Sequence, residues 1–291
     1  MTSPCLVCGS QAFRPVFKPK DSGNRAFERC LDCSLLQMRP MPSNEELFAY
    51  YQTYDVLGER DPYFQDVWGP NALQSHEGRD IAARAAWLLR IVPKPERVLE
   101  VGSGHGLFLR VMKDAGIRAE GVELHAGAAK KSAEVHGVKV HHGTLESLAL
   151  GTYGVVAMWD LIEHVADPNP LLAKVHSLLP SGGHLIVETP DEGALLDRAV
   201  LLASRLGIAW PADLFYGIHH LVLFRRQTMR RILDRHGFDV VEISAAETYV
   251  PRIFRGSGLR DVAARAGLGA LFRVARLVDR QNKMLVAARK R

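Results

Sequence analysis

A glycine-rich turn between a predicted strand and a predicted helix constrains the fold of this chain more than any other feature. The apolar stretch 97–99 leads into Glu100-Val-Gly-Ser-Gly-His-Gly106, and an amphipathic stretch follows at 107–113. Glycine permits backbone with φ > 0 and close approach of a ligand, while N–H groups at the start of a helix point into the space above the sheet. The pattern therefore predicts an α/β fold with a small-molecule site at the carboxyl end of this strand.

The spacing of the glycines separates this turn from the dinucleotide-binding fingerprint. The G-x-G-x-x-G pattern would require glycine at position 107, which is Leu107. A nicotinamide cofactor is thereby disfavoured. Many α/β proteins use such a turn merely to pack a strand against a helix, so the turn alone does not identify a ligand.

The order of the later apolar stretches extends the α/β prediction. Residues 118–123 form a second predicted strand that ends in Glu123, about 20 residues past the turn, where a parallel sheet places a ribose-binding carboxylate. Further strands are predicted at 138–142, 153–159, after Gly183, and at 237–243 and 283–289. The prediction is a doubly wound, seven-stranded and mostly parallel sheet.

Three further motifs carry a family resemblance over about residues 90–290. Asp160-Leu-Ile-Glu-His164-Val-Ala-Asp-Pro168 fits D-x-x-E-H-x-x-D-P, and Leu179-Pro-Ser-Gly-Gly183 differs from L-x-P-G-G only by the extra Ser181. His220-Leu-Val-Leu-Phe224 fits H-L-x-x-F. In this order, the motifs resemble class I S-adenosylmethionine (SAM) dependent methyltransferases, in particular those of ubiquinone and natural-product sugar biosynthesis.

The resemblance implies a set of cofactor-binding residues. Glu100 would accept hydrogen bonds from the cofactor's ammonium, the glycines would approach its methionine and ribose, and Glu123 would bind the ribose. Thr144 stands where the family has Gly-Asp, so a hydroxyl would meet the adenine; a helix cap is the alternative interpretation. Core packing is the alternative for Trp159. The full set is Glu100, Gly102, Ser103, Gly104, Gly106, Glu123, Leu124, Thr144, Leu145, Trp159 and Asp160.

In methyl transfer the protein itself does little covalent chemistry, and only removal of the acceptor's proton requires a specific catalytic side chain. Histidine suits this role because its unperturbed pKa is near 6.5. His220, from the pair His219-His220 beside the acceptor pocket of the family, is the first candidate, and His164 is the second. Asp160 would accept a hydrogen bond or orient the base. The alternative is that these histidines are structural and that Glu163 and His164 tie their loop together.

The four cysteines of the chain form two CxxC pairs, Cys5 with Cys8 and Cys30 with Cys33. Pairs at this separation match a structural zinc site that four thiolates close, leaving no position for water. Disulfides are the alternative, but the first residues lack the features of an export signal, so a cytoplasmic location is expected.

The expected organisation has three parts: a zinc ribbon at 1–40, a helical linker or lid at 41–92, and a SAM-binding domain at 93–291. The linker holds Tyr50, Tyr51, Tyr54 and the stretch 61–64, which either close over the cofactor or pack in a core. An apolar insertion at about 192–220 is interpreted as a substrate cap.

The net charge of +5 is uneven, because residues 252–291 carry eleven Lys and Arg residues against two Asp residues. The apolar residues of this region are spaced as in an amphipathic surface helix: Leu259, Val262, Ala263, Ala266, Leu271, Ala275 and Val278. A solvated face is the simplest interpretation. Attraction of a phosphorylated or nucleotide-linked substrate, or contact with an anionic membrane that holds a lipidic one, are the alternatives. No apolar run reaches the ~18 residues of a membrane span.

Together these features predict methyl transfer from SAM to an oxygen or carbon of a small-molecule acceptor such as a sugar, lipid or polyketide-like intermediate. An RNA methyltransferase that uses the ribbon and the basic C-terminal segment is one alternative, although the ribbon lacks the interleaved aromatic and basic residues typical of nucleic-acid binding. A non-catalytic SAM-binding scaffold is another. The acceptor, the pathway and the oligomeric state are not determined by the sequence.

Overall fold

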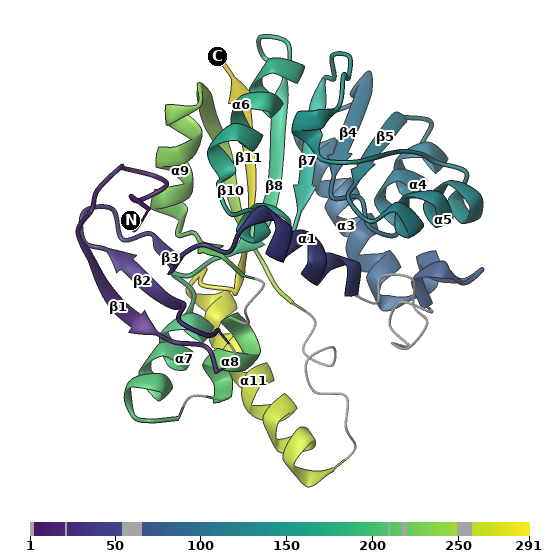
Figure 1. Ribbon diagram of the computed structural model, residues 1–291. Coiled ribbons are helices and arrows are strands. Elements are labelled where there is room, and N and C mark those ends of the chain that lie inside the picture. The colour runs from purple at the N-terminus through teal and green to yellow at the C-terminus, as the bar shows by residue number, and fades with distance from the viewer. Residues whose placement is uncertain (1–2, 21, 54–65, 209, 217–219, 249–257) are drawn as a thin grey trace.

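The structure is a computed structural model that describes the chain except for residues 1–2, 21, 54–65, 209, 217–219 and 249–257 (Figure 1). Tyr54, the stretch 61–64 and His219, which the sequence singled out, lie outside the described residues.

A seven-stranded sheet forms the centre of the molecule, in the order β10-β11-β8-β7-β4-β5-β6. The strands from β8 to β6 run parallel, and β11 is antiparallel to both of its neighbours. The expected α/β class and mostly parallel sheet are therefore confirmed. The strands are β4 (Arg97–Val101), β5 (Arg118–Glu123), β6 (Lys139–His142), β7 (Val155–Trp159), β8 (His184–Pro190), β10 (Phe238–Ala246) and β11 (Lys283–Lys290).

Helices cover both faces of this sheet, so its central strands are apolar throughout. In β7 every residue is buried; Val155 and Ala157 face one core, and Val156 and Met158 face the other. The first core is completed by α3 (His76–Ile91), α4 (Leu107–Asp114) and α5 (Ala126–His136), and the second by α6 (Pro168–Leu178) and α9 (Arg226–Arg235).

The Asp-Pro pair that ends the D-x-x-E-H motif starts a helix. Asp167 caps α6, because its side chain accepts a hydrogen bond from Asn169 N at 2.9 Å, and Pro168 occupies the first helical turn, where no N–H group is needed. Between β7 and α6 the chain makes a short 3-10 helix, η3 (Ile162–His164), which presents the Glu-His pair of the motif.

A small antiparallel sheet joins the N-terminal segment to the large domain. Its strands are β1 (Phe13–Phe17), β2 (Ala26–Cys30), β3 (Leu36–Arg39) and β9 (Val222–Leu223). Strand β9 lies in the H-L-x-x-F element, and its Leu223 pairs with Leu36 of β3. The four-cysteine segment is therefore built together with a strand that lies some 180 residues later in the chain.

The remaining elements lie around the carboxyl ends of the central strands. They are α1 (Asn44–Thr53), η1 (Ala72–Gln74), η2 (Leu145–Ser147), α7 (Leu195–Arg205), α8 (Trp210–Tyr216) and α11 (Leu259–Leu277). No helix within the described ranges is both long and apolar enough to span a bilayer.

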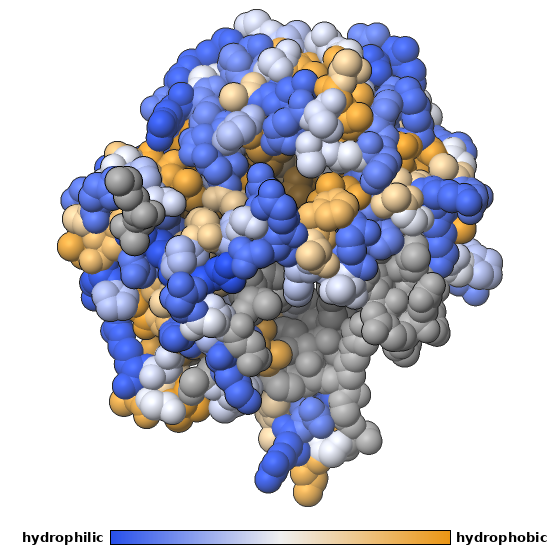
Figure 2. Space-filling view, in the orientation of Figure 1, coloured by the Kyte–Doolittle hydropathy of each residue, from blue (hydrophilic) through white to orange (hydrophobic). Residues whose placement is uncertain are grey.

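Helix α11 packs mainly with residues that the sequence did not single out. Leu268 and Phe272 are buried beside Ala275 of the predicted stripe, whereas Leu259 and Val262 of that stripe are 89% and 48% exposed. Most of the predicted apolar stripe therefore faces solvent, because the helix contacts α7 along its other side. Figure 2 shows apolar side chains at the lower end of the molecule, where Figure 1 places α7 and α11.

Candidate active site

The glycine-rich turn follows β4 and adopts the conformation expected from its sequence. Gly102, Gly104 and Gly106 have φ values of 74°, 50° and 72°. A Cβ atom on Gly102 would lie 2.9 Å from Leu161 Cδ1, and one on Gly106 would lie 2.9 Å from Ser132 Cβ. All three positions therefore favour glycine for backbone conformation, and Gly102 and Gly106 also lack room for a Cβ atom unless a neighbouring side chain moves.

The carboxylate of Glu123 lies against this turn at the end of β5. Its Oε2 accepts a hydrogen bond from Gly104 N at 2.8 Å, and its Oε1 accepts one from His125 N at 2.7 Å. Glu123 and the turn line a cavity of about 1360 Å³ above the carboxyl ends of the strands. A carboxylate held at this place can bind the ribose hydroxyls of a nucleoside.

Glu100 is buried behind the turn at 4% exposure. Burial raises the pKa of its carboxyl group well above the usual range, and Oε2 has no hydrogen-bond partner among the described residues. A buried acceptor without a partner is costly. A cofactor ammonium group would satisfy it, so this residue fits SAM in its chemistry, although Glu100 lies behind the residues that line the cavity.

The other predicted cofactor residues divide into two groups. Leu124, Thr144, Leu145 and Asp160 line the cavity together with Gly102, Gly104 and Glu123. Thr144 also caps η2, because its hydroxyl accepts from Ser147 N at 3.3 Å. Ser103, Gly106 and Trp159 lie behind the cavity surface; Trp159 packs against Phe108 with ring centroids 5.2 Å apart, as its core-packing interpretation expects.

Asp160 is held by two cations that the sequence did not identify. Its Oδ2 accepts from Lys283 Nζ at 2.5 Å and from Arg84 Nη2 at 3.1 Å, and both cations also bind Glu188. Although burial opposes it, the charges of Asp160 and Glu188 raise the pKa of Lys283, so this amine stays charged. Asp160 has φ of 49°, a left-handed conformation that is rare outside glycine and is held here by these contacts. No motif marks Arg84 or Lys283 in the sequence.

The two candidate histidines lie together at the cavity surface. The rings of His164 and His220 have centroids 4.9 Å apart, and both line the cavity. His220 Nδ1 lies 3.0 Å from Phe215 O. Because a carbonyl only accepts, Nδ1 carries the proton, and the lone pair of the neutral ring is then on Nε2.

Glu163 lies beneath these histidines and is 1% exposed. Its Oε2 accepts from Thr189 Oγ1 at 2.9 Å, and its Oε1 is 3.8 Å from His164 Nε2. Burial, followed by the charge of Asp160, raises the pKa of Glu163 to about 8. Its backbone carbonyl accepts from Leu221 N at 2.7 Å, which ties η3 to the segment that carries His220.

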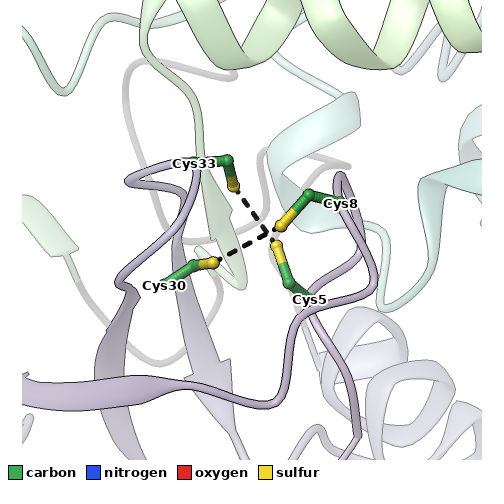
Figure 3. A group of neighbouring side chains, drawn as sticks. All are labelled: Cys5, Cys8, Cys30 and Cys33. Atoms are coloured by element: carbon green, nitrogen blue, oxygen red, sulfur yellow. Dashed lines mark hydrogen bonds between the residues drawn. The ribbon is translucent and has the colours of Figure 1, made fainter.

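The four cysteines converge at one place, as Figure 3 shows. Cys5 and Cys33 have their Sγ atoms 3.4 Å apart, Cys8 and Cys30 have theirs 3.5 Å apart, and all four lie within 4.8 Å of one another. Tetrahedral coordination of zinc with Zn–S bonds of about 2.3 Å places sulfurs about 3.8 Å apart. The donor set therefore fits this metal in type, number and spacing.

The class I methyltransferase fold is defined by three features of this structure together: the order of the strands, the glycine-rich turn after β4, and the acidic residue at the end of β5. A family model described as "Methyltransferase domain" matches residues 73–243, more than half of the chain, and the chain therefore belongs to this family. It is a SAM-dependent methyltransferase.

Similar proteins agree with this assignment. A ubiquinone biosynthesis O-methyltransferase of Ralstonia nicotianae is 30% identical over 148 residues, which are 47% of this chain and 60% of that protein. One of Marinobacter nauticus is 37% identical over 170 residues, 54% of this chain and 68% of that protein. Among solved structures, magnesium protoporphyrin IX methyltransferase of Synechocystis PCC 6803 is similar with a TM-score of 0.53. That match covers 84% of this chain and 100% of the other at 15% identity, which supports the fold alone.

Proposed function

We propose that this enzyme transfers a methyl group from SAM to an oxygen atom of a small-molecule acceptor. The observation that carries the proposal is the pair His164 and His220, which shares one cavity with the glycine turn and Glu123. A cofactor bound at the turn and a proton acceptor on the same surface are what methylation of a hydroxyl group needs. The relatives described above are O-methyltransferases of ubiquinone biosynthesis, which supports oxygen as the methylated atom.

Within this proposal, the cofactor lies in the cavity against the glycine turn and Glu123. Glu100 receives its ammonium group, Glu123 its ribose, and η2 with Leu145 borders its adenine. The sulfonium of SAM supplies the methyl group. The protein aligns the acceptor, excludes water and removes a proton.

His220 is the first candidate for the base. Its Nδ1–H group donates to Phe215 O, which fixes the ring orientation, and Nε2 is the nitrogen that would take the acceptor's proton. His164 packs beside it and is the second candidate. Asp160 has a different role: with Lys283 and Arg84 bound to it, its carboxylate fixes the end of β7.

We also propose that the four cysteines hold a structural zinc ion. Four sulfur ligands leave no open position for a substrate, so the metal would stabilise the ribbon rather than take part in catalysis.

The test is a screen of phenolic and sugar-type acceptors with zinc-loaded protein and SAM, in which S-adenosylhomocysteine (SAH) formation is measured. With a turned-over acceptor, His220→Ala should lower kcat by about 100-fold, as expected for loss of a general base. His184→Ala is the matched control, because His184 begins β8 and lies at the amino end of this strand, away from the cavity at the carboxyl ends. An unchanged kcat for His220→Ala would exclude this residue as the base.

The same preparation tests the alternative functions. Strongly salt-dependent RNA binding at low micromolar concentration would favour an RNA methyltransferase. SAH binding without turnover of any acceptor class would favour a scaffold.

A further inference from the structure

The acceptor end of the cavity contains a buried acid and a buried tyrosine that the sequence did not single out. Asp197 of α7 is 7% exposed, Tyr216 of α8 is 2% exposed, and both line the cavity. The Tyr216 hydroxyl donates to Asp197 Oδ1 at 2.8 Å. Burial raises the pKa of Asp197 well above its usual range. Oδ1 is therefore engaged by protein, and Oδ2 is the atom that remains for a ligand.

This pair lies beside the proposed base. Tyr216 directly follows Phe215, whose carbonyl oxygen is 3.0 Å from His220 Nδ1. Leu196 and Val200, which flank Asp197 on α7, line the same cavity. The Asp197–Tyr216 pair and the proposed base therefore border the same cavity, so one acceptor can contact both.

The titratable groups around the cavity are mostly acidic. The pKa values of Glu163 and Asp197 are raised, so the negative charge comes mainly from the other carboxyl groups. Among the described residues that line it, seven carry carboxyl groups, one is a lysine and none is an arginine. That lysine, Lys283, already binds Asp160 and Glu188 at 2.5 Å and 2.9 Å. The buried Oε1 of Glu163 has no hydrogen-bond partner in the described part of the chain, and it supplies no cation. A phosphate placed here would lose its hydration without gaining a cation, which is strongly unfavourable.

Building on the proposed function, we propose that Asp197 and Tyr216 form the acceptor subsite, where the Asp197 carboxyl group holds an O–H or N–H donor of an uncharged or basic acceptor. Phosphorylated and nucleotide-linked acceptors are excluded by the same surface. Apolar neighbours such as Val200 and Phe215 receive the carbon skeleton of the acceptor. An amine would bind as the ammonium ion and form an ion pair with the ionised carboxyl group of Asp197, whereas an alcohol would bind by a neutral hydrogen bond.

The test uses three probes with one apolar body: 2-phenylethanol, 2-phenylethylamine and 2-phenylethyl phosphate. Each is titrated by NMR into zinc-loaded protein that is saturated with SAH. The alcohol and the amine should bind at millimolar concentration or below, and the phosphate should bind at least tenfold more weakly than either. Asp197→Asn should weaken the amine about tenfold and the alcohol less than threefold, because a charge-assisted hydrogen bond becomes a neutral one.

Asp213→Asn is the matched control, because Asp213 lies on the same cap but outside the cavity lining, where it accepts from Lys20 N. Phosphate binding equal to that of the amine, an unchanged amine affinity in Asp197→Asn, or failure of all three probes to bind would each overturn the proposal. Titration with SAH separates the two proposals. If the unmodified protein does not bind SAH, the proposed function itself is contradicted. If it binds SAH but the three probes do not show the expected order of affinity, only the acceptor subsite is contradicted.

Discussion

Glu163 illustrates at the residue scale how burial changes the chemistry of a motif. The sequence offered a structural role for the Glu-His pair, in which it ties its loop together, and the structure places the glutamate beneath the cavity at 1% exposure. Burial and the neighbouring charge of Asp160 raise its pKa to about 8, so Glu163 is protonated near neutral pH. It then supports His164 and the backbone of η3 rather than serving as a negative charge.

Glu163→Gln, which resembles the protonated acid, should therefore become stabilising relative to the unmodified protein as pH rises. The folded-state pKa lies above the ordinary value of 4.5, so the protonated acid contributes stability that is complete below about pH 4.5 and is lost as pH rises through about 8. Glutamine has no such loss. Urea denaturation at pH 5, 7 and 8.5 should show the difference in free energy of unfolding between variant and unmodified protein growing with pH. A difference independent of pH would show that Glu163 is ionised throughout.

At the element scale, a strand of two residues decides where the proposed base lies. Strand β9 is too short to be stable alone, and it pairs with β3, while Met38 N of β3 donates to Leu221 O at 2.8 Å. The same region holds an ion pair between Arg29 of β2 and Glu192, which follows β8, at 2.6 Å. Both side chains are less than one tenth exposed. His220 directly precedes Leu221, so these contacts with the ribbon also fix the position of His220.

Arg29→Gln should destabilise the protein by about 2–4 kcal/mol, because removing one partner leaves Glu192 buried with only the half-exposed Arg225 as its cation. Arg14→Gln on the exposed side of β1 is the control and should cost less than about 0.5 kcal/mol. Urea denaturation gives the free energy of unfolding of each variant. Amide exchange should also accelerate at residues 221–224 in Arg29→Gln alone, and equal behaviour of the two variants would contradict the proposed link.

On the scale of the whole molecule, cofactor and acceptor regions are supported by different parts of the chain. The glycine turn and Glu123 belong to β4 and β5, near one edge of the large sheet. The proposed acceptor side is formed by α7, α8 and the segment of β9. The ribbon packs there, because Phe17 and Phe27 contact Tyr216 with ring centroids 6.2 Å and 6.0 Å apart.

Removal of the proposed zinc by a chelator should therefore affect these regions unequally. Loss of the metal leaves four thiol groups with no common ligand, and the small sheet, including β9, should lose protection against amide exchange. SAH affinity measured by calorimetry should stay within about threefold of the zinc-loaded value. Simultaneous loss of SAH binding would show instead that the ribbon supports the whole fold, and unchanged exchange in the ribbon would argue against a structural metal.

The sequence alone determined the features whose cause is local or periodic. Gly102, Gly104 and Gly106 predicted left-handed backbone, the spacing of apolar stretches predicted the strands of the sheet, and the acid at 123 predicted a carboxylate beside the turn. Two CxxC pairs predicted a four-sulfur cluster. These inferences succeed because each depends on a few neighbouring residues or on a repeat that any α/β sheet must have.

Only the tertiary structure decided which distant side chains meet. Lys283 with Asp160, Arg29 with Glu192, and β3 with β9 are pairs separated by more than 100 residues, and no spacing in the sequence distinguishes them from other charged or apolar pairs. The stripe predicted for α11 faces solvent for the same reason, because both sides of that helix carry apolar residues and only packing against α7 selects one. Burial then sets the charges of Glu163 and Asp197, since the cost of desolvating a carboxylate depends on its surroundings in three dimensions and not on its neighbours in the chain.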